Sequence, residues 1–451
     1  MPKQNELVGP KGNFLLGHLP EFRKDPLAFL IKCAQEQSEI VPLRMLHLPV
    51  YLFTNADHVE YVLGTHSRDF VKSRMYKLGG SIFGNGIGMS EGDFWLRQRR
   101  LIQPIFHRER ISAYGQIMVD HTQQMLATWQ EGQILDIPEA MLQLSMGITT
   151  RTLFNVDDAS HTIGKAITVA LKEIANRFST LISLPENVPT PANLRYQRAA
   201  RHLDEGIYRM IQQRRAQPED TGDLLSLLLQ ARHEDGSRMT DQQLRDEMVN
   251  LIIAGFETMA VAFIWIWYVL AQYPEVEAKL LAELQAVLGE RTPTVADLPK
   301  LPYTEMVLTE MLRAYPPAPM MGREATKDFE LGGYHFPAGT EIWLSPWVLH
   351  HNPRYFEAPN EFRPERWEGN LLKQLPKFAY CPFSGGPRQC LGNTYAVMEA
   401  KLVLTTVIQK FQLKVVPGQV VEPDFTFTLR PKHGLKMVLA KRSLSPSAQL
   451  N

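Results

Sequence analysis

The sequence predicts a mainly α-helical protein that carries small β-sheets. The main evidence is a long, strongly apolar segment at 241–272, which a proline ends, together with several shorter segments of helical apolar spacing. Short runs of β-branched and aromatic residues near both ends of the chain indicate strands. We expect one domain over 1–451, with a minor β part drawn from 40–55, 325–345 and 412–441.

Capping residues and glycines define the elements of the N-terminal half. Asp25 caps a helix that begins at Pro26, because proline fits the first helical turn, and Asn55 caps a later helix. Residues 74–93 are rich in glycine and lack periodicity, which predicts a long loop of the kind that often serves function. The expected order is a helix at 26–37, strands at 41–46 and 50–54, a helix at 55–63, the 74–93 loop, an arginine-rich helical region at 94–129, and two helices within 160–215.

Prolines and glycines also mark the ends of elements in the C-terminal half. Pro316 and Pro317 stop a helix, and Gly332 with Gly333 supplies the turn of a hairpin. The expected order is a helix at 241–272, a helix at 301–315, a hairpin at 329–344, an irregular segment at 352–389, a helix from the region of Cys390 to about 411, and short closing strands.

Charge and cysteine content exclude several classes of function. Lysine plus arginine equals aspartate plus glutamate at 48 each, so the overall charge gives no argument for nucleic acid or an anionic membrane as a partner. Three cysteines argue against a disulfide framework and indicate a reducing compartment. The N-terminus is polar, and Glu257, which would be costly in lipid, interrupts the apolar stretch at 248–271. We therefore expect a cytoplasmic protein without a transmembrane anchor.

The most informative segment runs from Phe383 to Gly392 and reads Phe-Ser-Gly-Gly-Pro-Arg-Gln-Cys-Leu-Gly. Its glycines and proline form a tight turn before a helix, which places Cys390 near a helix N-terminus, where the dipole and free amides favour a thiolate. A thiolate is a strong donor ligand for an iron porphyrin, and Arg388 would meet an anionic group such as a haem propionate. The alternative is an inert buried cysteine, which is the default for the other two cysteines.

The same loop matches the haem-binding signature of the cytochrome P450 superfamily, Phe-x-x-Gly-x-Arg-x-Cys-x-Gly. All five fixed positions are present, at Phe383, Gly386, Arg388, Cys390 and Gly392. The sequence therefore resembles a soluble, bacterial-type P450 without a fused reductase. The resemblance implies that haem b (iron protoporphyrin IX) is ligated by Cys390 and lies between the long apolar helix and the helix of the cysteine loop.

Glu310 and Arg313 lie three residues apart on an expected helix, so they share a face. By itself this common spacing indicates no more than an ion pair on the protein surface. The P450 resemblance implies a buried pair here, joined by an arginine from an irregular segment, and Pro364-Glu-Arg366-Trp367 matches the family's Pro-Glu-Arg-Phe pattern apart from its tryptophan. The implied role of Glu310, Arg313 and Arg366 is structural, because a carboxylate between two guanidinium groups would fix that segment behind the haem.

The long helix contains the sequence Ala254-Gly255-Phe-Glu257-Thr258. A glycine inside a helix is unfavourable and indicates close packing against something flat, such as a haem face. The family pattern is Ala-Gly-x-acid-Thr, and it implies that Ala254 and Gly255 contact haem while Glu257 and Thr258 deliver protons during oxygen activation. The alternatives are a Thr258 hydroxyl bonded to a carbonyl one turn earlier, and a Glu257 that is a satisfied buried acid or an exposed one.

Trp95 and Arg99 lie one helical turn apart in the arginine-rich region and therefore on one face. The resemblance implies that this pair, together with Arg388 and with Arg323 after the proline-rich break, holds the haem propionates. The neighbouring arginines would form either a solvated basic face or a docking face for an acidic electron-transfer protein.

The resemblance further implies a monooxygenase that inserts one atom of dioxygen into a lipophilic substrate by hydroxylation or epoxidation. No flavin or nicotinamide fingerprint is present, so electrons would come from a separate ferredoxin or flavodoxin with its NAD(P)H-dependent reductase. The expected substrate is a fatty acid or a terpenoid, because the candidate pocket residues are mostly apolar; ordinary core packing is the alternative for each of them. These candidates are Met75, Phe83, Phe178, Leu181, Met320 and Phe427.

Three other functions stay open. The intact Glu257–Thr258 pair argues against a haem-thiolate isomerase, dehydratase or peroxygenase, and the lack of a recognisable output domain argues against a haem-based sensor or carrier. A hydrolase with Cys390 as its nucleophile would need a histidine, and none lies nearby in the sequence. Bound haem would separate a P450 from this last alternative.

Overall fold

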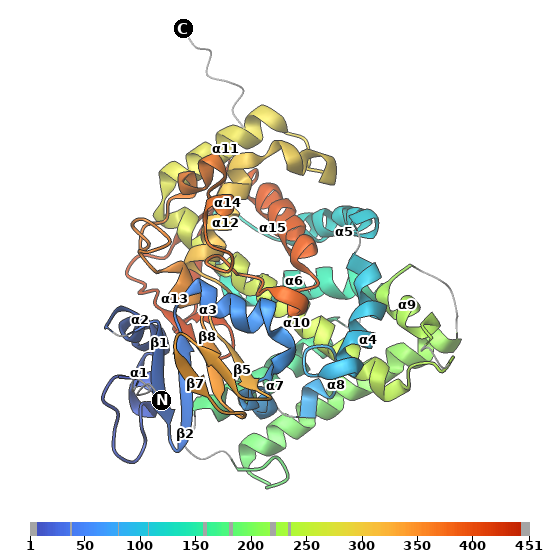
Figure 1. Ribbon diagram of the computed structural model, residues 1–451. Helices are drawn as coiled ribbons and strands as arrows, with labels where there is room; N and C mark the ends of the chain where they lie inside the picture. Colours follow the sequence, from blue (N-terminus) through green and yellow to red (C-terminus); the bar gives the residue numbers. More distant parts are fainter. Residues whose placement is uncertain are drawn as a thin grey trace.

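Helices make up most of the molecule, and the strands labelled in Figure 1 gather near the N-terminus. This is the mainly α-helical architecture with small sheets that the sequence predicts. The computed structural model describes residues 7–36, 38–79, 81–106, 108–156, 160–179, 184–216, 222–232 and 236–442.

The elements alternate irregularly between helix and strand. The α-helices are α1 (Leu19–Lys24), α2 (Pro26–Glu36), α3 (Ala56–Glu60), α4 (Gly92–Ile102), α5 (Arg108–Ala127), α6 (Ile137–Phe154), α7 (Ser160–Ser179), α8 (Pro191–Ala216), α9 (Leu224–Gln230), α10 (Asp241–Gln272), α11 (Pro274–Val287), α12 (Pro302–Ala314), α13 (Pro346–His350), α14 (Leu371–Gln374) and α15 (Asn393–Ile408). Shorter helical turns are η1 (Tyr61–Thr65), η2 (Ser67–Asp69), η3 (Arg74–Gly79), η4 (Ser81–Phe83), η5 (Gln103–Phe106), η6 (Val295–Lys300), η7 (Pro364–Asn370) and η8 (Gly386–Arg388). The strands are β1 (Ile40–Met45), β2 (Leu48–Phe53), β3 (Phe70–Lys72), β4 (Ile134–Asp136), β5 (Met321–Ala325), β6 (Phe329–Leu331), β7 (Tyr334–Phe336), β8 (Glu341–Leu344), β9 (Phe411–Val415), β10 (Pro423–Phe425), β11 (Leu429–Pro431) and β12 (Lys436–Lys441).

The largest sheet combines strands from distant parts of the chain in the order β1-β2-β8-β5-β3. In Figure 1 the blue N-terminal strands lie beside the orange ones accordingly. Strand β3 pairs antiparallel with β5, and their register places Lys72 opposite Arg323. The predicted hairpin is confirmed as β6–β7, with positive φ angles of 61° and 80° at Gly332 and Gly333, whereas β8 pairs with β2 and β5 instead.

Helix α10 crosses the middle of the molecule (Figure 1) and has the bounds that the sequence predicts. A capping box formed by Thr240 and Gln243 starts it, and it ends at Tyr273, next to a proline. The helix is long and apolar enough to cross a membrane, yet 83% of its most apolar window is buried inside the protein. It therefore forms the central packing element between the two largest clusters of buried apolar side chains.

Several regions differ from the sequence-based expectation. The helical region at 94–129 is divided into α4 and α5, because Pro104 cannot continue the helical hydrogen-bond ladder and lies in the turn η5. The 74–93 loop contains the short helical turns η3 and η4. Helix α6 was not predicted from the sequence. Its buried residues lie nearly all around the helix, so its sequence lacks a clear amphipathic period.

Candidate active site

The cysteine loop packs tightly against η1. Gly386 has a positive φ of 66°, and a Cβ there would lie 1.7 Å from the carbonyl oxygen of Leu63, so this position requires glycine. The Cys390 amide donates to the carbonyl oxygen of Phe383 at 3.0 Å, which closes the loop. Helix α15 then begins at Asn393, with Gly392 as its N-cap residue. The sequence signature is therefore a compact turn whose geometry fixes the direction of Cys390.

The Cys390 thiol combines exposed surface with a crowded protein environment. Its side chain has exposed surface, whereas burial among protein atoms is the largest influence on its pKa and raises it. The Gly392 amide and the Arg99 guanidinium lower the pKa, so the expected thiolate-favouring groups exist, but in the protein alone burial outweighs them. A coordinated metal ion would reverse this balance, because coordination deprotonates a thiol.

Helix α10 has one opening in its otherwise buried central part, at the predicted motif. Ala254 is exposed and Thr258 is partly exposed, while Ile253 and Phe256 are buried. Leu391, next to Cys390, packs against the cluster that contains Ile253 and Phe256, so the cysteine loop and the open part of α10 belong to one region. The residue next to Cys390 and the α10 segment that the sequence singles out thus adjoin the same apolar cluster.

Gly255 lies where α10 and α6 approach each other closely. A Cβ at this position would lie 2.9 Å from Cγ2 of Thr149 in α6, so this contact already accounts for a small residue in the helix. The expected contact of Gly255 with a haem face stays a prediction.

Glu257 and Thr258 point to different partners. Thr258 Oγ1 donates to the Ala254 carbonyl oxygen at 2.7 Å, which is the local bond that we considered as an alternative. Glu257 is 3% exposed, and its carboxylate accepts hydrogen bonds from Thr428 Oγ1 at 2.8 Å and from Arg430 Nη2 at 2.6 Å. Arg430 lies on β11, so the C-terminal hairpin β10–β11 is tied to the acid of the motif.

Cationic side chains gather beside the cysteine loop. Arg388 lies over the ring of Trp95 at 4.2 Å, Arg99 lies over the same ring at 5.7 Å, and Arg99 Nη1 donates to the Gln389 carbonyl oxygen at 2.9 Å. Arg323 is buried and donates to the Gly322 carbonyl oxygen. The structure therefore brings together the residues that the sequence selects as holders of the propionates.

Lys72 and Glu91 belong to the same cluster, although the sequence did not indicate them. Glu91 forms ion pairs with Arg388 and, at 3.6 Å, with Lys72. Burial and repulsion from Arg388 lower the pKa of Lys72 to about 7, and burial followed by repulsion from Arg323 and Arg99 lowers the pKa of Arg388. Since Glu91 is the carboxylate that pairs with these cations among the described residues, the cluster has an excess of positive charge that an anionic group would neutralise.

These features fit a haem. Cys390 would offer a sulfur ligand to the iron, α10 presents the exposed Ala254, and the surplus of cations would suit two propionates. Among the described residues, no group of three or more His, Cys, Asp or Glu side chains is placed so that it could hold a metal ion. The fold and the site thus have the donor set that a haem protein would need.

Glu310 is the centre of a fully buried ionic cluster behind the cysteine loop. Its carboxylate accepts two hydrogen bonds from Arg313 at 2.9 Å and one from Arg366 Nε at 2.9 Å. The amide of Arg363 and the indole Nε1 of Trp367 each donate another at 2.9 Å. The tryptophan that departs from the family pattern therefore supplies an additional donor to Glu310.

The remaining donors of this cluster hold the irregular segment by its backbone. Arg313 donates to the carbonyl oxygens of His350 and Pro359, at 2.9 Å and 2.8 Å. His350 Nε2 in turn accepts from the Cys381 amide at 3.0 Å, which implies that its Nδ1 carries the proton. Burial lowers the pKa of His350 well below its usual range, so the ring stays neutral and can keep this acceptor role. A chain of contacts thus connects Glu310 to the start of the cysteine loop.

The candidate pocket residues fall into separate groups. Phe83 and Phe427 stack with ring centroids 6.3 Å apart, although they lie far apart in the sequence. Met75 and Met320 pack instead against the cluster around Trp343. Leu181 lies outside the described residues, as does the side chain of Phe178.

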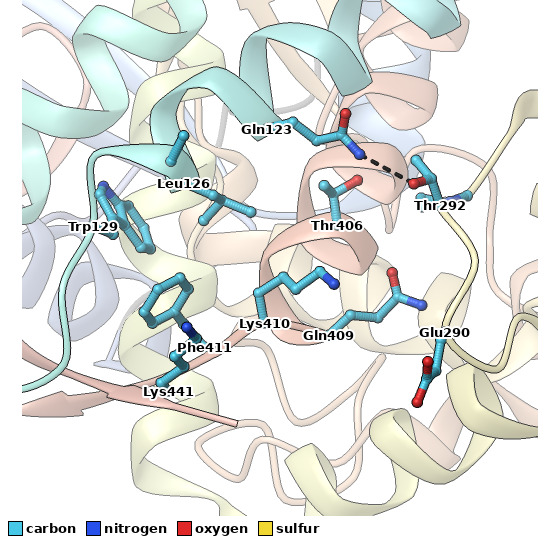
Figure 2. Close-up of a pocket in the computed structure, with 12 residues that line it drawn as sticks. Gln123, Leu126, Trp129, Glu290, Thr292, Thr406, Gln409, Lys410, Phe411 and Lys441 are labelled. Carbon is cyan, nitrogen blue, oxygen red and sulfur yellow. Dashed lines mark hydrogen bonds between the residues drawn. The ribbon is translucent and has the colours of Figure 1, made fainter. Parts of the chain in front are cut away.

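A surface hollow at the other end of α15 is not the active site. Figure 2 shows its lining, in which Gln123 Nε2 of α5 donates to Thr292 Oγ1 at 3.1 Å, beside Thr406 and Phe411. Because a helix rises about 1.5 Å per residue, α15 separates this hollow from Cys390 by roughly 20 Å.

Comparisons with known proteins agree with this site. The family model for Cytochrome P450 matches residues 8–438. Two proteins of Streptomyces melanosporofaciens are similar: cyclooctat-9-en-7-ol 5-monooxygenase is 37% identical over 90% of this chain and 88% of its own length, and cyclooctatin synthase is 35% identical over 92% of each. Pentalenene oxygenase of Streptomyces avermitilis is 30% identical over 95% of this chain and 96% of its own. The solved structure of cyanobacterial CYP120A1 with retinoic acid bound has a TM-score of 0.88, with 26% identity, over 97% of this chain and all of that one.

The chain belongs to the cytochrome P450 family. It is a haem-dependent monooxygenase that inserts oxygen into a lipophilic substrate with electrons from redox partners.

The first prediction concerns Glu310. Glu310→Ala should lower the free energy of unfolding by about 3–5 kcal/mol, because it leaves two buried guanidinium groups without their anion. It should also reduce haem incorporation. Chemical unfolding and the haem content of the purified protein measure both effects. Glu365→Ala is the matched control, since this partly exposed carboxylate pairs with Lys279 and should cost at most about 1 kcal/mol. Full haem content in Glu310→Ala would contradict the interpretation.

The second prediction concerns the haem-free protein. The pKa of Lys72 is about 7 in the folded chain and near 10.5 when unperturbed, so between these values the unfolded chain binds more protons. Stability should therefore rise by up to a few kcal/mol as the pH increases through this range. Urea unfolding across the range measures the rise, and Lys72→Met should flatten it while the exposed Lys377→Met should not. An unchanged rise in Lys72→Met would assign it to other groups.

Proposed function

We propose that this P450 hydroxylates or epoxidises a cyclic terpene hydrocarbon or terpene alcohol. The observation that carries the proposal is the similarity, over nearly the full length, to oxygenases named for cyclooctat-9-en-7-ol and pentalenene. The apolar character of the candidate cavity wall supports it, since such substrates bind mainly through the burial of apolar surface.

The candidate wall combines the open face of α10 with two loops. Ala254 supplies the exposed part of α10, Leu391 lies beside the cysteine, and the stacked rings of Phe83 and Phe427 come from the 81–90 loop and the C-terminal hairpin. A substrate without charged groups would leave no buried charge unpaired at these side chains. A fatty acid is less well supported, because its carboxylate would need a cationic partner at this wall.

We assign the cofactor as haem b, held within a single domain over the whole chain. Cys390 would ligate the iron, Phe383 and Gly392 would shape the loop around it, and Trp95, Arg99, Arg323 and Arg388 would hold the propionates, with Lys72 as a further cation. Bound in this way, the haem supplies the redox chemistry by which dioxygen is activated.

Two side chains of α10 are assigned to proton handling. Thr258 is partly exposed, and while its Oγ1 donates to the Ala254 carbonyl oxygen at 2.7 Å, the oxygen lone pairs can still accept a hydrogen bond from a proton donor. Glu257, held by Arg430 and Thr428, would be the acid from which protons reach that hydroxyl. Arg313, Arg366 and Glu310 have no contact with this path and are assigned a structural role.

We further propose that a ferredoxin or flavodoxin, reduced by its NAD(P)H-dependent reductase, delivers electrons in the cytoplasm. The exposed cations Arg97 and Arg100 on α4, with Lys373 and Lys377 nearer the cysteine loop in sequence, support an acidic partner.

The third prediction tests the cofactor and the substrate class. The reduced protein exposed to carbon monoxide should show the strongly red-shifted Soret band of a thiolate-ligated haem, and Cys390→His should lose that shift, because the electron-donating sulfur is replaced. Titration with cyclic terpenes should then change the spin state of the ferric haem, whereas fatty acids of similar size should change it less. A fatty acid preference would overturn the substrate proposal without affecting the family.

The fourth prediction concerns Thr258. Thr258→Ala should form product at least about tenfold less per reductant consumed and release the difference as peroxide, because a proton-transferring hydroxyl is missing. Product, peroxide and reductant are measured together. Thr258→Ser is the matched control, since it keeps the hydroxyl and should stay near the wild-type ratio. Tight coupling in Thr258→Ala would contradict the assigned role.

A further inference from the structure

A row of polar side chains on α10 binds the backbone of the glycine-rich loop. Asp246, Glu247 and Asn250 are 6%, 1% and 5% exposed, although polar groups this deeply buried are costly unless they are hydrogen-bonded. Their partners are found in residues 82–88 of the loop. The loop that the sequence analysis singled out is therefore attached to the same helix that carries Ala254 and Thr258.

Each side chain of the row forms a hydrogen bond with a particular backbone group of the loop. Asp246 Oδ2 accepts from the amide of Asn85 at 2.8 Å, and Glu247 Oε2 accepts from the amide of Ile87 at 2.9 Å. Asn250 bridges two points of the loop, because its Nδ2 donates to the Phe83 carbonyl oxygen at 2.6 Å and its Oδ1 accepts from the Gly88 amide at 3.1 Å.

The glycines of the loop match this row. A Cβ on Gly84 would lie 2.1 Å from Asp246 Oδ1, one on Gly86 2.3 Å from Asn250 Nδ2, and one on Gly88 2.5 Å from Asn250 Oδ1. Since larger residues would displace the loop from the row, the pattern Gly-Asn-Gly-Ile-Gly at 84–88 allows one close register against α10.

The row also determines where Phe83 lies. Asn250 holds the carbonyl group of Phe83 itself, and it precedes Ala254 by one helical turn. Phe83 is 5% exposed and stacks on Phe427 of the C-terminal hairpin. The distance between the Phe83 ring and the open face of α10 therefore depends on bonds made by side chains of α10.

We propose that Asp246, Glu247 and Asn250 are positioning residues for the substrate, which hold the 82–88 backbone in one register and so place Phe83 at the cavity wall. The proposal rests on the proposed function to the extent that Phe83 contacts the substrate. The row restricts the size of molecule that fits between Phe83 and Ala254.

The test uses the haem-loaded protein and two azole probes that bind haem iron, imidazole and the larger 4-phenylimidazole. Glu247→Ala and Asn250→Ala should speed hydrogen exchange at the amides of Ile87 and Gly88 by about five- to tenfold, which corresponds to one lost hydrogen bond. The affinity for 4-phenylimidazole should change by a similar factor, while that for imidazole should stay within about twofold.

Three variants separate positioning from general stability. Glu247→Gln keeps an oxygen acceptor for the Ile87 amide and should behave like the wild type. Gly86→Ala perturbs the register from the loop side and should reproduce the effect of Asn250→Ala. Gln272→Ala, an exposed polar change at the end of α10, is the matched control and should change neither readout.

Phe83→Ala should alter the ratio of azole affinities without changing hydrogen exchange at Ile87 and Gly88. The proposal is overturned if the row variants leave the exchange unchanged, if exchange rises while the azole ratio stays constant, or if Phe83→Ala leaves the ratio constant. Because the azoles report on cavity size alone, a shifted ratio in a protein that ignores cyclic terpenes would overturn the substrate proposal and leave this one standing.

Discussion

The position of the cysteine loop depends on the hydrogen bonds and ion pairs of the buried Glu310 carboxylate. A charge removed from water this completely is tolerated only when its hydrogen-bonding capacity is filled, and here five donors surround it. Its two arginine partners donate their remaining N–H groups to carbonyl oxygens of residues 350–361, a segment with little regular structure of its own. The ionic cluster thus supplies this segment with the hydrogen bonds that a helix or sheet would otherwise provide. His350 extends this network to the cysteine loop, because its ring accepts a hydrogen bond from the Cys381 amide.

A second constraint acts at the opposite side of the cysteine loop, where charge is left unbalanced. The Glu310 cluster is internally satisfied, whereas burial, together with repulsion from Arg388, lowers the pKa of Lys72 to about 7. A protein that needed only stability would place an apolar residue or a second acid there. The contrast fits a first cluster that completes the fold and supports the proposal that an anionic ligand completes the second.

The sequence could predict those features that depend on local pattern or on a contiguous signature. The bounds of α10, the hairpin at Gly332 and the grouping of Cys390 with Arg388 all follow from residues close together in the chain. Lys72, Glu91 and Arg430 could not be found in this way, because a β-register or a hairpin return brings them to the site from afar. Gly255 shows a subtler limit: the need for a small residue was visible, but its cause, the approach of Thr149 on α6, was not.

Helix α10 combines these constraints in one element. Its N-terminal turns bind the 82–88 backbone through Asp246, Glu247 and Asn250, its middle presents Ala254 and Thr258, and Glu257 binds the C-terminal hairpin. The two segments held at either side meet through the stacked rings of Phe83 and Phe427. A change of position in one segment would therefore be opposed by polar bonds to the same rigid helix and by contact with the other. The helix to which we assign proton handling thus also positions the two segments of the proposed substrate wall, so both proposed roles depend on the geometry of α10.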